Sequence, residues 1–156
     1  MGRIDCVIDV AAPITLVFAA VTDPKRSVDW NPHIIEVSNL SSYPVVEGTT
    51  WQQVVSAMGQ TLRVNCRVSL MKAPMEGVLQ VDGPQRARII TRCSRIGKLT
   101  HVEQSVEYDT GKGVAGAMAA RIVQPFLRRE VEHSLQRMRR DLEIEAASEP
   151  QAGTAS

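Results

Sequence analysis

At 156 residues, the chain has the length of one ordinary globular domain, which can bury enough surface to form a single hydrophobic core. Its 18 Lys and Arg residues almost balance its 17 Asp and Glu residues, so no strong positive field favours nucleic acid or an anionic membrane as a partner. No stretch approaches the roughly 18 apolar residues that span a bilayer, and residues 1–10 lack the continuous apolar core of a secretory signal.

The three cysteines, Cys6, Cys66 and Cys93, are odd in number, lack CxxC spacing and lie among apolar or strand-forming residues. This usage is typical of reduced thiols in a cytosolic protein and does not indicate a disulfide framework. We therefore expect a cytoplasmic protein that is not integrated in a membrane.

The first predicted elements are a strand and a pair of short helices. Residues 4–10 alternate between an apolar and a mainly polar face, which predicts a strand with one buried side. Pro13 is suited to the first position of a helix, and this helix should end near residues 23–24 because a residue before proline disfavours helical geometry. A second short helix is expected over residues 25–30 and should end at the Asn-Pro pair of residues 31–32.

Six further strands are predicted after the helix pair. They span residues 34–40, 49–58, 61–70, 78–81, 87–93 and 99–108. β-branched and aromatic residues favour these segments as strands, and turn residues separate several of them, as at Gly59 and Gly83. Strands joined mostly by short hairpins indicate an antiparallel meander.

The pattern changes to a helical period from Val114 to Ile144, which predicts one long amphipathic helix. Pro125 lies inside it and should cause a kink. A solvated face is expected in its second half, formed by Arg128, Arg129, Glu130, Arg137, Arg139 and Arg140. Acidic residues interleave with these arginines at salt-bridge spacing, which argues against a nucleic-acid site.

The last residues differ in composition from the rest of the chain. Residues 146–156 are small and polar, and they include no large apolar side chain. This composition predicts a disordered tail. A single domain is therefore expected over residues 1–145.

The segment IDVAAPITLVFAAVTDPKRSVDWNPHI, residues 8–34, and the segment VEGTTW, residues 46–51, resemble the opening of proteins in the SRPBCC superfamily. The order of elements also resembles its α+β helix-grip fold, over nearly the whole chain. In that fold a seven-stranded curved antiparallel sheet wraps around a long C-terminal helix, with two short helices between the first and second strands. The superfamily includes START lipid-transfer domains, pollen allergens, polyketide cyclases and dehydratases, and co-chaperone domains, so the resemblance implies an architecture rather than one reaction.

The resemblance implies a cavity between the sheet and the long helix, mostly apolar with a few polar groups. Candidate inward residues on the strands are Val55, Val64, Cys66, Leu79, Ile89 and Thr91. Candidates on the helix are Met118, Ile122 and Phe126. Trp30, His33 and Trp51 lie where the resemblance places the mouth or wall of the cavity.

The two tryptophans have two interpretations. Their rings are able to stack on a planar ligand, or they pack in the protein core. We favour Trp30 as a structural plug between the helix pair and the sheet, and the two interpretations of Trp51 weigh equally.

The last predicted strand directs polar groups toward the cavity. Thr100, Gln104 and Tyr108 share one face of this strand with two valines. If the other face of the strand pointed inward instead, two carboxylates would be buried, which is unfavourable. Buried polar groups need partners, which a ligand, water molecules or the neighbouring backbone would supply.

The histidines are the remaining candidates for chemistry. His33 lies near the expected mouth and is a weak catalytic candidate, whereas His101 and His133 should face solvent. The chain contains no GxGxxG, GxxxxGK[ST], HExxH or GxSxG motif. We therefore predict no cofactor and no metal site.

The leading hypothesis is a protein that binds a small hydrophobic molecule, which is lipid-like, aromatic or polyketide-like. The first alternative is an enzyme of the polyketide cyclase or dehydratase type, in which His33 or Gln104 moves protons. The second is a co-chaperone-like interaction module that uses the outer sheet face. The sequence leaves the choice between a monomer and a homodimer open.

Overall fold

The computed structural model describes residues 2–57, 59–109 and 113–148, with the backbone alone described at 57, 114–120 and 122. Seven strands form one antiparallel sheet in the order β1-β7-β6-β5-β4-β3-β2. The strands are β1 (Gly2–Val10), β2 (Ile34–Ser38), β3 (Thr50–Ala57), β4 (Gln60–Lys72), β5 (Glu76–Asp82), β6 (Ala87–Ile96) and β7 (Leu99–Tyr108). The helices are α1 (Ile14–Val21), α2 (Pro24–Trp30) and α3 (Gly113–Ser148).

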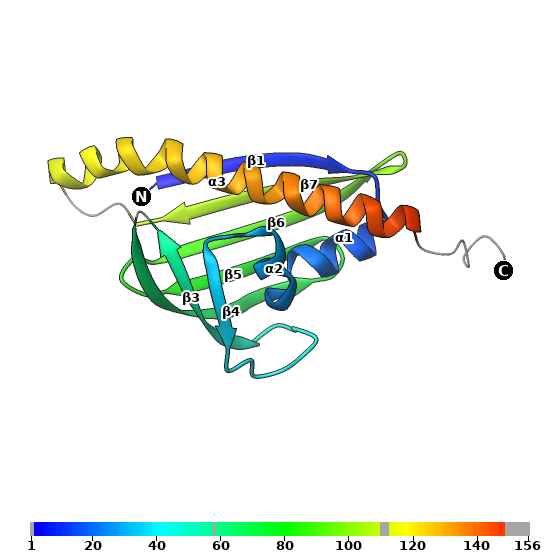
Figure 1. Cartoon of the computed structure of the whole chain (residues 1–156), viewed down its shortest axis with the longest axis horizontal. Coiled ribbons are helices and arrows are strands. Elements are labelled where there is room, and N and C mark those ends of the chain that lie inside the picture. Colours follow the sequence, from blue (N-terminus) through cyan, green and yellow to red (C-terminus); the bar gives the residue numbers. More distant parts are fainter. Residues whose placement is uncertain (1, 58, 110–112, 149–156) are drawn as a thin grey trace.

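The sheet curves around α3, as the helix-grip prediction requires. Figure 1 shows α3 running along β1 and β7, with α1 and α2 lying across the sheet near the C-terminal half of α3. The two short helices connect β1 and β2, the two edge strands of the sheet. The predicted α+β architecture is therefore confirmed. Among the described helices, none combines the length and the apolar composition needed to cross a bilayer.

The starts of the two short helices follow from local chemistry. Pro13 has extended geometry and is the residue that precedes α1, so its predicted place as the first helical residue is wrong by one position. In α2 the Asp23 side chain accepts a hydrogen bond from the backbone N–H of Lys25, and Pro24 occupies the first helical position. This cap fixes Pro24 as the residue at which α2 begins.

Strand β2 is shorter than predicted because of Asn39. Its φ of 56° lies in the left-handed region, which strand pairing does not accommodate, and β2 ends one residue earlier at Ser38. The hairpin predicted at Gly59 is confirmed, since Gly59 has a φ of 78° between β3 and β4.

Helix α3 is longer than predicted. It continues past Ile144 through Ser148, so residues 146–148 are helical and not part of a disordered tail. Ala146 and Ala147 favour this extension because alanine has the highest helix propensity. The rest of the predicted tail, residues 149–156, lies outside the described residues. At Pro125 the helix continues without a break, and the side chain of Pro125 is exposed.

The core consists of two main apolar clusters at opposite sides of the concave face. The first joins β1, α1 and the C-terminal half of α3 through residues that include Val10, Phe18, Val102, Leu135, Met138 and Leu142. The second lies on β3 and β4 and contains Trp51, Val64, Cys66 and Val68, with Leu79 and Val81 of β5 against it. Among the side chains of α3 that the structure describes, several belong to the first cluster and none to the second.

All three cysteines are buried and free, which confirms the predicted thiols. Burial raises the pKa of the Cys66 thiol to about 12 and that of the Cys93 thiol to about 11. The ordinary value is 9.0, so the unfolded chain loses thiol protons at a lower pH than the folded chain does. The free energy of unfolding must then fall as the pH rises above about 9.

We predict that Cys66→Ala weakens this alkaline loss. Relative to the wild type, the variant should lose less free energy of unfolding between about pH 8 and pH 10, because the thiol contributes up to about 1.4 kcal/mol per pH unit above its unfolded pKa. Urea unfolding at both pH values measures the difference. Equal losses in the two proteins would contradict a shielded Cys66 thiol.

Candidate functional site

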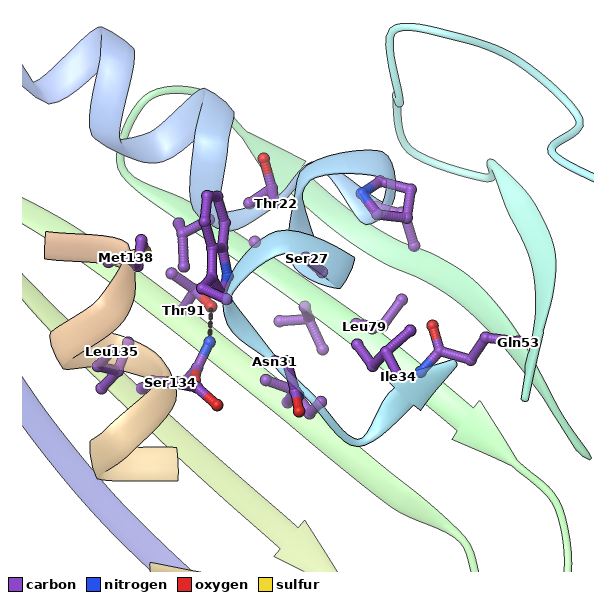
Figure 2. Close-up of a pocket in the computed structure, with 18 of the residues that line it drawn as sticks. Thr22, Ser27, Asn31, Ile34, Gln53, Leu79, Thr91, Ser134, Leu135 and Met138 are labelled. Atoms are coloured by element: carbon purple, nitrogen blue, oxygen red, sulfur yellow. Dashed lines mark hydrogen bonds between the residues drawn. The ribbon is translucent and has the colours of Figure 1, made fainter. Parts of the chain in front are cut away.

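A half-enclosed pocket of about 220 Å³ lies between the two core clusters. Its walls come from the C-terminal half of α3, from α2 and the end of α1, and from β2 to β7. Most of the lining is apolar, and it includes Val21, Trp30, Ile34, Trp51, Val55, Val68, Met71, Val78, Leu79, Ile89, Leu135 and Met138. Figure 2 shows Ser134, Leu135 and Met138 on α3 at one side, with Ile34, Leu79 and Gln53 at the other.

Many of the residues predicted from the sequence line this pocket. They are Trp30, His33, Trp51, Val55, Leu79, Ile89, Thr91 and Gln104. Trp30 is 6% exposed and belongs to the first core cluster, and Trp51 is 4% exposed and belongs to the second. Each tryptophan therefore packs in the core and also presents part of its surface to the pocket, and stacking on a ligand stays a prediction.

Other predicted residues do not line the pocket. Val64 and Cys66 are buried among the side chains of the second cluster. Phe126 does not line the pocket, but its ring packs against that of His33 in a T-shaped arrangement with a centroid distance of 6.0 Å. The side chains of Met118 and Ile122 lie outside the described residues.

The predicted phase of β7 is correct, but its polar groups have different partners. The buried Thr100 hydroxyl donates to the backbone oxygen of Ala12, at 2.7 Å, which makes it structural. The Tyr108 ring packs over Gly2 at the far end of the strand, and its buried hydroxyl has no hydrogen-bond partner among the described residues. Gln104 alone of these three residues lines the pocket.

His33 is held by contacts to two other elements. Its Nδ1 lies 2.9 Å from the backbone oxygen of Ser56, and its Nε2 contacts Oε2 of Glu130 on α3. A carbonyl and a carboxylate are both acceptors, so each nitrogen needs a proton between itself and its partner. Both ring nitrogens of His33 are therefore committed to the protein.

The position of Glu130 corrects one prediction. The sequence places it on the solvated face of α3, but its side chain is only 24% exposed and pairs with His33. A second ion pair, between Arg26 of α2 and Glu145 of α3 at 2.7 Å, lies farther along the same helix. The two pairs link the wall formed by α2 and the start of β2 to α3.

Several lining residues have no counterpart in the sequence prediction. They are polar side chains of α2 and its flanks, together with one on α3 and one on β3: Thr22, Ser27, Asn31, Ser134 and Gln53. For Ser134 a signal exists, because it precedes the apolar Met138 by four residues on one helix face. The orientation of α2 has no such signal, because the helix is only seven residues long.

The comparisons with known proteins agree with this architecture. A family model described as "polyketide cyclase / dehydrase and lipid transport" matches residues 1–143. The search of curated proteins gives no match.

Solved structures of the same fold come from several bacteria. TTHA0849 of Thermus thermophilus has a TM-score of 0.78 at 17% identity, covering 95% of this chain and 100% of that protein. The Zhui aromatase/cyclase from Streptomyces has a TM-score of 0.74 at 14% identity, covering 96% and 99%. A START superfamily protein from Mycobacterium smegmatis has a TM-score of 0.67 at 16% identity, covering 93% and 97%.

Identities this low establish a common fold and nothing about a shared ligand. The match of the family model over almost the whole chain is more specific, and it confirms the resemblance to the SRPBCC superfamily. The chain belongs to the family of polyketide cyclases, dehydrases and lipid-transport proteins.

Proposed function

We propose that this protein binds a small hydrophobic molecule in the pocket between α3, α2 and the sheet. The observation that carries the proposal is the pocket itself, which is lined mainly by apolar side chains and contains a few polar groups. Such a lining is typical of ligand sites, because the apolar surface supplies affinity while a few polar groups fix orientation. The family contains lipid-transport proteins, which agrees with this role.

The arrangement of the core supports an unfilled space at this place. Helix α3 buries Leu135, Met138 and Leu142 in the cluster on the β1 side, whereas Trp51 and Val68 belong to the cluster on β3 and β4. A ligand seated between them would contact both clusters and remove apolar surface from water.

A cyclase or dehydratase activity is the second candidate, and the contact between His33 and Glu130 favours it. This pair holds a proton at the pocket wall, and ring closure of a polyketone needs one group to remove a proton from carbon and another to protonate a carbonyl oxygen. Because both His33 nitrogens are engaged, this chemistry requires that the contact with Glu130 or Ser56 opens.

The outer face of the sheet gives weaker support to a protein-interaction role. Arg92 pairs there with Glu76 at 2.9 Å and with Glu103 at 3.8 Å, and Arg3 pairs with Glu107 at 3.2 Å. Exposed ion pairs of this kind are typical of a solvated surface. The pocket therefore remains the stronger candidate site.

We predict that Ser134→Phe blocks ligand binding. The new ring would occupy the pocket from α3, so binding of the neutral fluorescent probe phenylnaphthylamine should weaken by about tenfold or more, as expected when the buried contacts of one ring are lost. His133→Phe places the same ring on the exposed neighbouring position and should bind the probe like the wild type. If both variants bind the probe equally well, the site lies elsewhere. If the wild type binds neither this probe nor any apolar compound in a native mass screen, the binding proposal is wrong.

We predict that His33→Ala destabilises the fold as well as the site. The substitution removes the hydrogen bonds to Ser56 and Glu130, so the free energy of unfolding should fall by about 1 kcal/mol or more. His133→Ala, on the exposed face of α3, is the matched control and should change it much less. Urea unfolding of the two variants compares these losses, and equal values would contradict a structural role of His33.

The catalytic candidate needs a separate assay. The wild-type protein should accelerate ring closure of a short linear polyketone, and Glu130→Gln should reduce this acceleration more than Glu132→Gln, a matched change at an exposed position. Product formation followed by chromatography measures both. If the wild type does not accelerate the reaction, the proton pair is structural and the activity is excluded for that substrate class.

A further inference from the structure

Most polar side chains of the pocket already have partners within the protein. The hydroxyl of Thr22 donates to the backbone oxygen of Phe18 at 2.7 Å, and that of Ser27 donates to the backbone oxygen of Asp23 at 3.0 Å. The side-chain oxygen of Gln53 accepts a hydrogen bond from Trp51 at 3.1 Å. These groups belong to the internal hydrogen-bonding of the wall, so they have less capacity left for a ligand.

Gln104 differs from the other amides of the pocket because the end that its bond leaves open is the acceptor oxygen, whereas Gln53 and Asn31 each use their oxygen in a bond to the protein. Gln104 and Thr91 are directly paired across β7 and β6, and Nε2 of Gln104 donates to the hydroxyl oxygen of the buried Thr91 at 3.3 Å. The dashed line at Thr91 in Figure 2 marks this bond. Among the described residues, none donates a hydrogen bond to Oε1 of Gln104. The wall therefore presents the amide oxygen of Gln104 as an open acceptor whose position is fixed by Thr91.

The lining carries almost no charge. Among the described residues that line the pocket there is no Lys, Arg, Asp or Glu, and His33 is engaged by Glu130. Moving a carboxylate or phosphate into such a site removes its water without supplying a counter-charge, which is strongly unfavourable. The lining therefore selects against anionic ligands such as fatty acids.

The volume limits the size of the ligand. A dry apolar cavity of about 150 Å³ holds benzene, and pockets for drug-sized molecules begin at about 300 Å³. The pocket of about 220 Å³ lies between these values. It matches a molecule of one or two fused rings better than a long acyl chain.

We propose that the pocket selects a small neutral ring compound whose hydroxyl or N–H group donates a hydrogen bond to Oε1 of Gln104. This inference rests on the proposed function, because it names the class of ligand for the same pocket. It gives Gln104 the role of a specificity-determining residue, and it gives Thr91 the role of the residue that orients the Gln104 amide.

Four naphthalenes substituted at the same ring position test the proposal. β-Naphthol donates and accepts a hydrogen bond, the methoxy compound only accepts, the methyl compound does neither, and β-naphthoate is an anion. Calorimetric titration of the wild type should show that β-naphthoate binds at least about tenfold more weakly than β-naphthol. Equal binding of the two would overturn the selection for neutral ligands.

The variant Gln104→Leu tests the acceptor. Affinity for β-naphthol should fall by about two- to tenfold, the range expected for one hydrogen bond, while affinity for the methyl and methoxy compounds should stay level or rise. Gln80→Leu, the same change at an exposed position of β5, should leave all four affinities unchanged. Thr91→Val should reproduce part of the loss for β-naphthol, and it keeps the test decisive if Gln104→Leu does not fold.

The outcomes separate this inference from the proposed function. If the methyl compound binds but neither variant changes the preference for β-naphthol, the pocket is a ligand site and the role of Gln104 is wrong. If affinity for the methoxy compound falls in Gln104→Leu, the amide acts as a donor and the assigned polarity is wrong. If no naphthalene binds but another apolar compound does in the native mass screen, the inference is wrong and the proposed function stands; if no apolar compound binds, both are wrong.

Discussion

The packing of the C-terminal half of α3 against β1 and β7 is the contact on which the rest of the structure depends. Leu135, Met138 and Leu142 are almost completely buried there, and burying each such side chain contributes about 1.5–3 kcal/mol. The ion pairs from α3 to Arg26 and His33 are partly exposed, and exposed pairs contribute about 0–1 kcal/mol. Apolar packing therefore determines where α3 lies, and the ion pairs adjust the wall beside it.

This one-sided packing explains why a pocket exists at all. A helix that buries its apolar side chains over β1 cannot also cover β3 and β4 of a strongly curved, seven-stranded sheet. The apolar side chains on β3 and β4 form their own cluster around Trp51 and Val68. The space left between the two clusters is bounded by α2, whose position is set by the Asp23 cap and by the pair between Arg26 and Glu145.

The sequence predicts the fold well because the spacing of its apolar residues follows the repeat of a helix or a strand, which backbone geometry alone determines. The alternation in residues 4–10 and 61–70 and the helical period after Val114 identify which face each element buries, and the structure confirms these faces at Ile4, Cys66 and Leu135. Boundaries depend on single backbone conformations, such as the left-handed Asn39, and periodicity does not encode them. The pocket depends further on how α2 is oriented, which only tertiary packing determines.

Glu130 shows why residue type alone misidentifies a site. It lies among arginines at salt-bridge spacing, so the sequence assigns it to solvent, and only the fold brings it to His33. This contact and the one to the backbone oxygen of Ser56 engage both nitrogens of His33, the one titratable side chain found among the described lining residues. Because His33 is engaged in holding the pocket wall, ligand recognition depends on the shape of the pocket and on hydrogen bonds to its uncharged side chains. Binding therefore follows directly from the resting geometry, whereas catalysis requires a contact that stabilises the fold to open first.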